Sequence, residues 1–216
     1  MKKLRQRFRC SFLAGEEILN AIDDVERNPR YKCEGALAKN IFKPFGLIDH
    51  SPRLIIMGQD PYPNGLATGI PFEVKKGRNA VAMRNICKSL GLKGEWFDIA
   101  SWAKQNDVLL LNASLSYSSH LSQYCVWRPF WNVVLPRLFI DSSVMALALG
   151  RKAHNVIKQQ EKERFLSARH PCARVAADDP LRMNPSKWKE LLRSCGISYP
   201  TVDSDNKNYG VEQWHS

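Results

Sequence analysis

Four short runs of apolar, mostly branched residues limit the folds open to this chain. They cover residues 54–57, 108–111, 144–149 and 165–168, and turn-forming or polar residues bound each run. Runs of this kind predict buried β-strands. Segments with helical spacing separate them, and strands alternating with helices favour right-handed crossovers and a parallel sheet. We therefore expect an α/β fold of three αβα layers around a four-stranded parallel sheet, with 108–111 as a central strand.

Helical spacing of apolar residues, together with helix-ending residues, predicts six helices. Their expected ranges are 11–27, 79–90, about 99–103, 130–139, 151–160 and 185–195. Asn28-Pro29 should end the first helix, and the fourth should begin after Pro129. A chain of this length can bury a sizeable core in a single domain. We expect one domain over 1–216, with its core at about 41–196. A helical N-terminal extension should cover 1–40 and give way after residue 30 to an irregular connection. A surface tail should cover 198–216.

Polar residues follow the ends of three predicted strands. Gly58-Gln59-Asp60-Pro61-Tyr62 comes directly after the first strand, Asn112 follows the second, and His170 comes soon after the fourth. The carboxyl ends of parallel strands meet at one edge of the sheet, where open α/β sheets bind their ligands. A carboxylate, an amide and an imidazole at that edge, with Tyr62 and Phe72 nearby, predict a small pocket for a flat, polar ligand.

The excess of basic over acidic residues indicates which kind of binding partner suits the chain. The chain has 32 Lys and Arg residues against 21 Asp and Glu residues, so its formal net charge is +11, and its pI is near 9.5. Such a balance favours a polyanionic partner, most simply nucleic acid. Charge alone fits a basic protein without such a partner equally well, so the site residues must decide.

Cysteine spacing and hydropathy indicate which metal sites, cellular compartments and membrane segments fit the chain. The six cysteines form no Cys-x-x-Cys pair, so neither a zinc ribbon nor an iron–sulfur cluster is indicated, and we expect no metal and no cofactor. Scattered thiols suit a reducing compartment. We expect a cytoplasmic protein, bacterial or in a virus-infected host, or a nuclear or organellar one in a eukaryote. No apolar run approaches the ~20 residues of a membrane helix. The basic start at 1–9 fits a solvated helix start, with an organelle-targeting segment as the alternative.

Three motifs together resemble the family 1 uracil-DNA glycosylases. Gly58-Gln59-Asp60-Pro61-Tyr62 is similar to the water-activating loop of that family, and Leu109-Leu110-Leu111-Asn112-Ala113-Ser114 is similar to its uracil-reading strand end. His170-Pro171 is similar to the start of its DNA-insertion loop. The motifs occur in the family's order and at compatible separations, and Phe72 stands where the family stacks the base. The likeness extends over about 41–196, which is most of the chain.

The resemblance implies a uracil-DNA glycosylase-like fold and a monofunctional, metal-independent hydrolase. Such an enzyme flips uracil out of DNA, hydrolyses its N-glycosidic bond and leaves an abasic site, which initiates base-excision repair of DNA damage. The implied partner is uracil-containing DNA, single- or double-stranded, and a DNA-mimicking inhibitor protein could also bind. We expect the chain to be a monomer.

Cleavage of an N-glycosidic bond builds positive charge on the sugar and negative charge on the leaving base. A site for it needs an anion near the sugar and donors near the base oxygens. Asp60 would supply the anion and, by resemblance, position the attacking water. By resemblance His170 would act as a neutral imidazole and donate to uracil O2, a role with precedent in other enzymes. The plainer interpretations are a turn-capping Asp60 and a surface or structural His170.

Four further residues would bind the base. Asn112 can donate and accept on the N3–H/O4 edge of uracil, whereas cytosine presents the reverse pattern. Phe72 would stack on the base, and Tyr62 would fill the space beside C5 and so exclude the methyl group of thymine. Gln59 would contribute its backbone on the O2 side. Core packing is the plainer interpretation of both aromatics, and a strand-ending turn that of Asn112. His120 aligns with a family histidine and is expected to be structural.

The expected DNA contacts depart most from the family pattern. The predicted contacts are Lys75, Lys76, Arg78, Arg151, Arg174 and Val175. The basic segment 75–81 replaces a proline-rich loop and could grip phosphates through charge. Arg151 follows Gly150 where a Gly-Ser pair is usual, and Pro63 stands where many members have a histidine. Arg174 occupies the position of the family's leucine wedge, so we expect its flat guanidinium to enter or brace the vacated base stack.

Two other functions fit parts of the pattern. One is a non-catalytic DNA-binding or polymerase-accessory module on the same fold, which the altered loops would allow. The other is a glycosylase for a different damaged base, against which Tyr62 and Asn112 argue. Plain DNA binding needs only charge, so the retained Asp60, Phe72 and His170 favour the enzyme.

Overall fold

The central sheet is built from four parallel strands. The computed structural model describes residues 8, 11–13, 15–33, 36–37, 40–63, 66–74, 81–92, 98–159, 164–174, 176 and 178–200. The strands of the sheet are β2 (Leu54–Gly58), β3 (Val108–Asn112), β5 (Met145–Leu149) and β6 (Phe165–Ala168). Their order is β3-β2-β5-β6, and every neighbouring pair is parallel. The predicted α/β class and the four strands are confirmed, and each strand lies within one residue of its expected range.

The expected central position of the second strand is wrong. β3 lies at the edge of the sheet, and β2 and β5 are the central strands. All five residues of β3 are nevertheless buried. Helix α5 (Ile99–Gln105) and the 3-10 helix η2 (Lys43–Gly46) pack against it. A continuous apolar run therefore indicates that both faces of a strand are covered. It does not indicate whether the strand is central or at the edge of the sheet.

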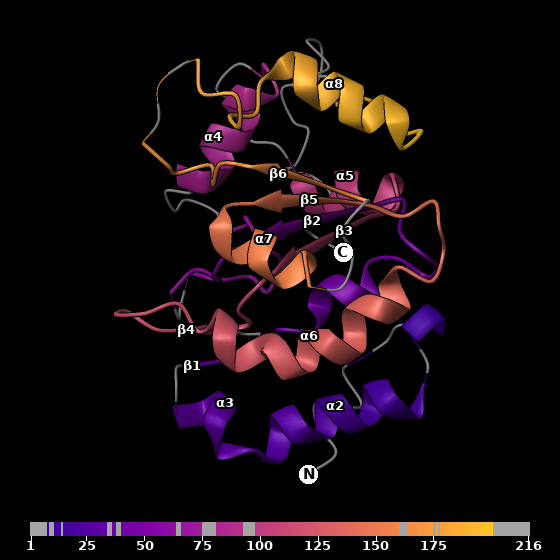
Figure 1. Ribbon diagram of the computed structural model, residues 1–216, viewed down its shortest axis with the longest axis vertical. Helices are drawn as coiled ribbons and strands as arrows, with labels where there is room; N and C mark the ends of the chain where they lie inside the picture. Colours follow the sequence, from indigo (N-terminus) through magenta and orange to yellow (C-terminus); the bar gives the residue numbers. More distant parts are fainter. Residues whose placement is uncertain are drawn as a thin grey trace, which may run out of the picture.

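Helices cover both faces of the sheet (Figure 1). On one face lie α7 (Arg151–Ile157) and α6 (Tyr124–Leu138), with α2 (Glu16–Arg27) packed on the outer side of α6, and on the other lie α4 (Val81–Ser89), α5 and α8 (Pro185–Ser194). Ile55 and Met57 of β2 point into the first core, and Leu54 and Ile56 into the second. This alternation follows from the two-residue repeat of a strand. The strand arrows all point the same way, so their carboxyl ends share one edge (Figure 1).

The first predicted helix begins later than expected. Residues Ser11–Leu13 form a separate 3-10 turn, and the helix proper is α2, Glu16–Arg27. The backbone of Gly15 is extended, so the helix cannot continue through it. Asn28 ends α2 as predicted, but Pro29 opens a new short helix, α3 (Pro29–Cys33), because proline is favoured at the first helical position.

Helix α6 begins at Tyr124, so the expected start after Pro129 is wrong. Pro129 and Pro136 both lie inside the helix, where each removes one backbone N–H donor. Both prolines are exposed, so water can reach the carbonyl groups that lose their partners. On the opposite side Trp127 and Trp131 are buried. Their indole N–H groups donate to Ser116 Oγ and to the Ala113 carbonyl oxygen, both at 2.8 Å, which fixes α6 against the loop after β3.

The connection before β2 is less irregular than expected. It contains α3, strand β1 (Ala36–Leu37) and η2. β1 pairs antiparallel with β4 (Ser116–Tyr117) in a second, two-stranded sheet that the sequence did not predict. Two-residue strands carry too little periodicity to be recognised from sequence.

The remaining helices lie close to their expected ranges. α4, α5, α7 and α8 correspond to the segments predicted at 79–90, 99–103, 151–160 and 185–195. The surface tail, however, does not begin at 198. Tyr199 donates its hydroxyl to the Leu90 carbonyl oxygen and packs on the second core, and residues beyond 200 lie outside the described part. None of the described helices is long and apolar enough to cross a lipid bilayer.

Two leucines that face each other across the pair β5–β6 test this arrangement of layers. Leu147 and Leu166 are in register, but Leu147 is fully buried and Leu166 is 48% exposed. Leu147→Ala should lower the free energy of unfolding by about 2–5 kcal/mol, because it leaves a cavity in the core. Leu166→Ala should cost less than about 1 kcal/mol. Urea unfolding of both variants checks this, and equal losses would contradict the described layers.

Candidate active site

The carboxyl ends of β2 and β3 are held side by side. Gly58 pairs with Asn112 in register. The pairing continues past the strands, because the Ala113 N–H donates to the Gly58 carbonyl oxygen and the Ser114 N–H donates to that of Gln59, both at 2.9 Å. The loop after β2 therefore starts in a fixed position beside Asn112, as the predicted convergence requires.

Asn112 and Phe72 meet at the backbone of Gly58. A Cβ atom at Gly58 would lie 2.7 Å from Asn112 Oδ1 and 2.8 Å from a ring carbon of Phe72, so no larger residue fits without movement. Asn112 is 6% exposed and Phe72 5%. Phe72 has a φ of 69°, a left-handed conformation that costs a bulky residue about 1–3 kcal/mol. Backbone strain of this kind occurs at ligand-binding positions, and here it is localised at the residue expected to stack on the base.

A mainly apolar cavity lies beside this contact. It is a small hollow of about 20 Å³ that opens to solvent. Its walls include Tyr62, Phe72, Asn112, Pro61, Gly69 and Leu111. Apolar walls with a single convergent amide suit a flat ring that is read along one polar edge. The structure thus brings together three of the four residues predicted to bind the base.

The fourth, Gln59, belongs to a neighbouring group around Gly150 at the end of β5. Gly150 has a φ of 99° and donates its N–H to the Ala168 carbonyl oxygen at 2.8 Å. A Cβ atom there would lie 3.0 Å from both Gln59 Cδ and His170 Cβ. The loops that follow β2, β5 and β6 therefore pack against one another at this glycine.

Asp60 is held by two side chains from other parts of the chain. Ser122, in the loop before α6, donates a hydrogen bond to Oδ1 of Asp60. The Lys152 ammonium nitrogen lies 3.6 Å from Oδ2, and each of the two side chains is about one third exposed. Among the described residues no hydrogen bond joins the Asp60 side chain to the backbone of its own turn. Ser122 and Lys152, which lie outside the loop, orient the Asp60 carboxylate. A preorganised anion in a catalytic site needs such fixed partners.

His170 presents one ring nitrogen as a donor. The Cys172 backbone N–H donates to Nδ1 at 3.2 Å, so this nitrogen carries no proton and the proton of the neutral ring is on Nε2. Burial lowers the pKa of His170, and Lys152 lowers it further, while Asp60 raises it. The net lowering favours a neutral imidazole near pH 7. The protonation state agrees with the predicted role of an uncharged donor.

Tyr62 is partly buried beside the cavity and packs on the second core. Burial raises the pKa of its phenol, and the backbone N–H groups of Ala82 and Met83 oppose that rise. Its hydroxyl oxygen has no ordinary hydrogen-bond partner among the described residues.

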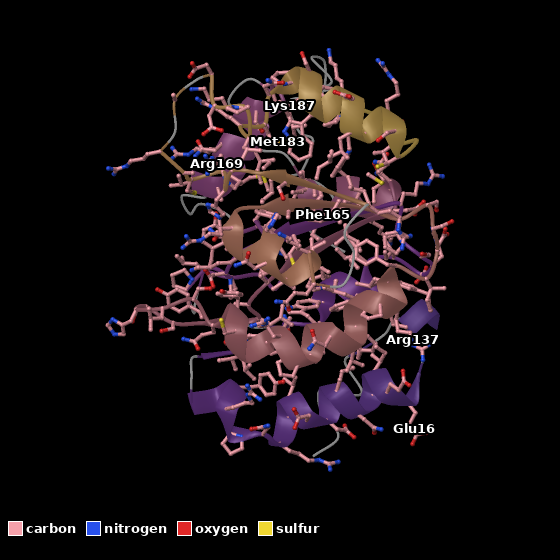
Figure 2. All side chains as sticks on the ribbon, viewed as in Figure 1. Glu16, Arg137, Phe165, Arg169, Met183 and Lys187 are labelled. Atoms are coloured by element: carbon pink, nitrogen blue, oxygen red, sulfur yellow. The ribbon has the colours of Figure 1, made fainter. Side chains whose placement is uncertain are left out.

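The loop after His170 is anchored at its far end. The Arg169 N–H donates to the Leu181 carbonyl oxygen at 2.8 Å, and its guanidinium pairs with Asp179 at 3.0 Å. Lys187 of α8 donates to the Arg182 carbonyl oxygen at 3.1 Å. Figure 2 shows Arg169, Met183 and Lys187 in the same part of the molecule, between the end of β6 and the start of α8. Arg174 is exposed within this anchored loop.

The predicted DNA-contacting residues are only partly placed. Arg151 is exposed as the first residue of α7, at the same edge as Gly150. Lys75, Lys76, Arg78 and Val175 lie outside the described residues, so their role stays a prediction.

His120, predicted to be structural, is exposed in the loop between β4 and α6. The described residues contain no group of three His, Cys, Asp or Glu side chains that could hold a metal ion.

Comparison with known proteins places the chain among relatives. No family model matches it. It is 30% identical over 161 residues to the uracil-DNA glycosylase of Lactococcus lactis subsp. cremoris, and this match covers 68% of the chain and 73% of the relative. The chain belongs to the uracil-DNA glycosylase family.

Other relatives in this family extend the match. The uracil-DNA glycosylase of Tropheryma whipplei is 29% identical over 197 residues, which cover 82% of the chain and 84% of the relative. That of Chlamydia abortus is 33% identical over 137 residues, which cover 56% of the chain and 58% of the relative. The chain therefore spans a little under three fifths of this last relative. The predicted family is confirmed.

Solved structures with this fold include two glycosylase mutants. A mutant of the mimivirus UNG in complex with UGI has a TM-score of 0.58 at 16% identity and covers 87% of the chain and 88% of its own. A mutant of the Nitratifractor salsuginis UNG has a TM-score of 0.58 at 18% identity. This match covers 91% of the chain and 98% of the Nitratifractor protein. At these identities the likeness concerns the fold, and the predicted uracil-DNA glycosylase-like fold is confirmed.

Two residues that touch Asp60 were missed by sequence reasoning. Lys152 could have been found, because it comes soon after the end of β5, and the topological argument that pointed to Asn112 at the end of β3 applies to it too. Ser122 gave no comparable signal, since it lies in an irregular loop 62 residues away in sequence. The site thus contains neighbours of Asp60 that the short sequence motifs do not include.

Proposed function

We propose that the chain releases uracil from DNA by hydrolysing the bond between the base and deoxyribose, the activity for which its family is named. The observation that carries the proposal is the meeting of three strand ends. Asn112 is the last residue of β3, Asp60 and His170 follow β2 and β6, and the glycines at 58 and 150 bring these segments into contact. The apolar cavity with Tyr62 and Phe72 provides the place for an extruded base.

In the proposed reaction the bond from uracil N1 to C1′ of the sugar breaks first. The bonding electrons remain on the base, and the sugar becomes an oxocarbenium-like cation. The Asp60 carboxylate stabilises that cation and orients a water molecule, whose oxygen then adds to C1′. The proton that this water loses is taken up, through Asp60 or the solvent, by the uracil anion. The products are free uracil and an abasic site in the DNA strand.

His170 stabilises the charge that the leaving base acquires. Its Nε2–H can donate to uracil O2, because Nδ1 is occupied by the Cys172 N–H. A neutral donor strengthens this hydrogen bond as negative charge gathers on O2, without transferring its proton. The lowered pKa of His170 keeps the ring in this form near neutral pH, and activity should fall at acid pH as the ring is protonated.

The base is selected by shape and by hydrogen bonding. Phe72 stacks on one face of the ring, and the Asn112 amide reads the N3–H and O4 groups. Cytosine would leave these buried groups unpaired, which carries a large penalty in a buried site. Tyr62 fills the space beside C5, where thymine has a methyl group.

The DNA partner is expected to bind along the basic edge that carries the site. Arg151 and Arg174 are exposed cationic side chains of that edge, and Lys75, Lys76 and Arg78 would add to them. We infer that Arg174 supports the vacated stack, so that duplex DNA depends on it more than single-stranded DNA does.

A DNA-mimicking inhibitor protein is a second proposed partner. The mimivirus relative is in complex with UGI, and a basic edge that accepts a polyanion would accept a protein of similar charge.

Removal of the Asp60 charge tests the proposed reaction. Asp60→Asn should reduce uracil release by about a thousandfold, because the sugar cation loses its counter-charge, while DNA binding persists. The assay follows abasic sites in uracil-containing oligonucleotides without added metal. Glu16→Gln, which removes a carboxylate from α2 (Figure 2), is the matched control and should keep full activity. DNA binding by the unaltered protein without release would favour the non-catalytic module instead.

Substitution of Tyr62 tests the exclusion of thymine. Tyr62→Ala should lower the preference for uracil over thymine by about tenfold or more, since the space for one methyl group is opened. Tyr62→Phe keeps the ring and should keep the preference, because the hydroxyl makes no ordinary hydrogen bond in the described structure. Rates on oligonucleotides that differ only in this base give the ratio. An unchanged ratio in Tyr62→Ala would show that another group excludes thymine.

Substitution of Arg174 tests the proposed support of the base stack. Arg174→Ala should reduce release from duplex DNA by about tenfold, with a smaller loss on single-stranded DNA, because a guanidinium contact with the base stack of about 0.5–2 kcal/mol is lost. Arg193→Ala, at an exposed position near the end of α8, serves as the charge-matched control. Equal, negligible losses on both substrates would rule the role out.

A further inference from the structure

We propose that Lys152 is a positioning residue of this site, which holds the Asp60 carboxylate in place and offsets its charge. The inference rests on the proposed function for its importance to catalysis. Its geometric part stands on the contacts of Lys152 alone. Lys152 is the second residue of α7, directly after the strand end at Gly150.

The first argument concerns the partners of the Asp60 carboxylate oxygens. Ser122 donates to Oδ1 and the Lys152 ammonium lies 3.6 Å from Oδ2, so the two oxygens of one carboxylate have separate partners. These partners come from different elements, the loop before α6 and the start of α7. Pro63, three residues after Asp60, has neither a side-chain donor nor a backbone N–H. The orientation of Asp60 therefore depends on groups outside its own loop.

The second argument is the balance of charge at His170. Asp60 raises the pKa of His170, because a nearby carboxylate stabilises the imidazolium form, and Lys152 opposes that effect. Without Lys152 the Asp60 charge would act on His170 uncompensated. The ion pair thus allows a carboxylate and a neutral imidazole to share one small site.

Other groups near His170 do not replace this effect. The Cys172 thiol on the same loop is expected to stay protonated, since desolvation raises its pKa. The Arg169 guanidinium is paired with Asp179 at 3.0 Å. Arg174 and Arg151 are exposed, where solvent screens their charges. Lys152 is the partly buried cation of this group that contacts Asp60 directly.

Stability of the fold does not account for the pair. Both side chains are about one third exposed, and ion pairs with such exposure contribute at most about 1 kcal/mol. The ammonium would also cancel part of the Asp60 charge felt by the sugar. Its benefit therefore lies in the direction of the carboxylate and in the protonation state of His170.

Four variants separate charge from position. Lys152→Met removes the cation, and Lys152→Arg retains it. Ser122→Ala removes the other partner of Asp60 without any change in charge. Lys158→Met removes a cation at the far end of the same helix, about 9 Å along the axis, and is the charge-matched control. Thermal unfolding of each variant shows that it is folded.

The first readout is the titration of the His170 ring by NMR, assigned with His170→Gln. Lys152→Met should raise the midpoint by roughly half to one pH unit, because the Asp60 charge is then unopposed in a partly screened site. Lys152→Arg, Ser122→Ala and Lys158→Met should leave it near the value of the unaltered protein. An unchanged midpoint in Lys152→Met would overturn the electrostatic part of the proposal.

The second readout is the kinetics of uracil release as a function of pH. Lys152→Met should lower kcat by about tenfold to a hundredfold and move the acid limb upward by the same amount as the NMR midpoint. Ser122→Ala should lower kcat without moving the acid limb, and Lys152→Arg should recover most of the activity. A rise in KM with an unchanged kcat would identify Lys152 as a phosphate contact and contradict the proposal.

Failure of the proposed function can be told apart from failure of this inference. If the unaltered protein releases no uracil, the function fails, yet the NMR titration still tests the link between Lys152 and His170. If the unaltered protein is active and Lys152→Met matches it in kcat and in pH profile, the function stands and the inference fails.

Discussion

The site depends on how closely three loops approach one another at the carboxyl edge of the sheet. Parallel pairing delivers the ends of β2, β3, β5 and β6 to that edge, and two glycines allow the remaining contact. At Gly58 the Phe72 ring and the Asn112 amide occupy the space of a side chain, and at Gly150 Gln59 and His170 do so. A methyl group at either position would separate groups that must act on one nucleotide, and at Gly150 the φ of 99° adds strain.

Electrostatic balance is the second requirement. The chemistry needs an anion beside the sugar and an uncharged donor beside the base, although an anion favours protonation of a neighbouring imidazole. Burial of His170, the Cys172 N–H on Nδ1 and the Lys152 ammonium all act in the opposite direction. These effects lower the pKa of His170 and so favour its neutral form, which suits a hydrogen-bond donor at the leaving base.

The sequence predicted the parts of the fold that have local signals. Apolar runs located the four strands, and polar residues after the strands located Asp60, Asn112 and His170, because parallel topology converts sequence position into a shared edge. The edge position of β3 escaped prediction, since covering helices bury an edge strand as fully as a central one. The start of α6 was missed because Pro129 lies on an exposed side of the helix, where the lost hydrogen bond is tolerated.

Contacts between distant segments were beyond sequence reasoning. Ser122 and Lys152 contact Asp60 although they lie 62 and 92 residues away in sequence. No periodicity or motif in the sequence predicts these contacts. The φ of 69° at Phe72 is likewise a tertiary result, because a bulky residue has no local preference for it.

A crystal structure of the Asp60→Asn variant with a uracil-containing oligonucleotide tests the central claim most directly. The account predicts one extruded uracil between Phe72 and Asn112, with His170 Nε2 at hydrogen-bond distance from O2 and residue 60 facing C1′. A nucleotide that stays stacked in the DNA, or a base bound away from this edge, would contradict it.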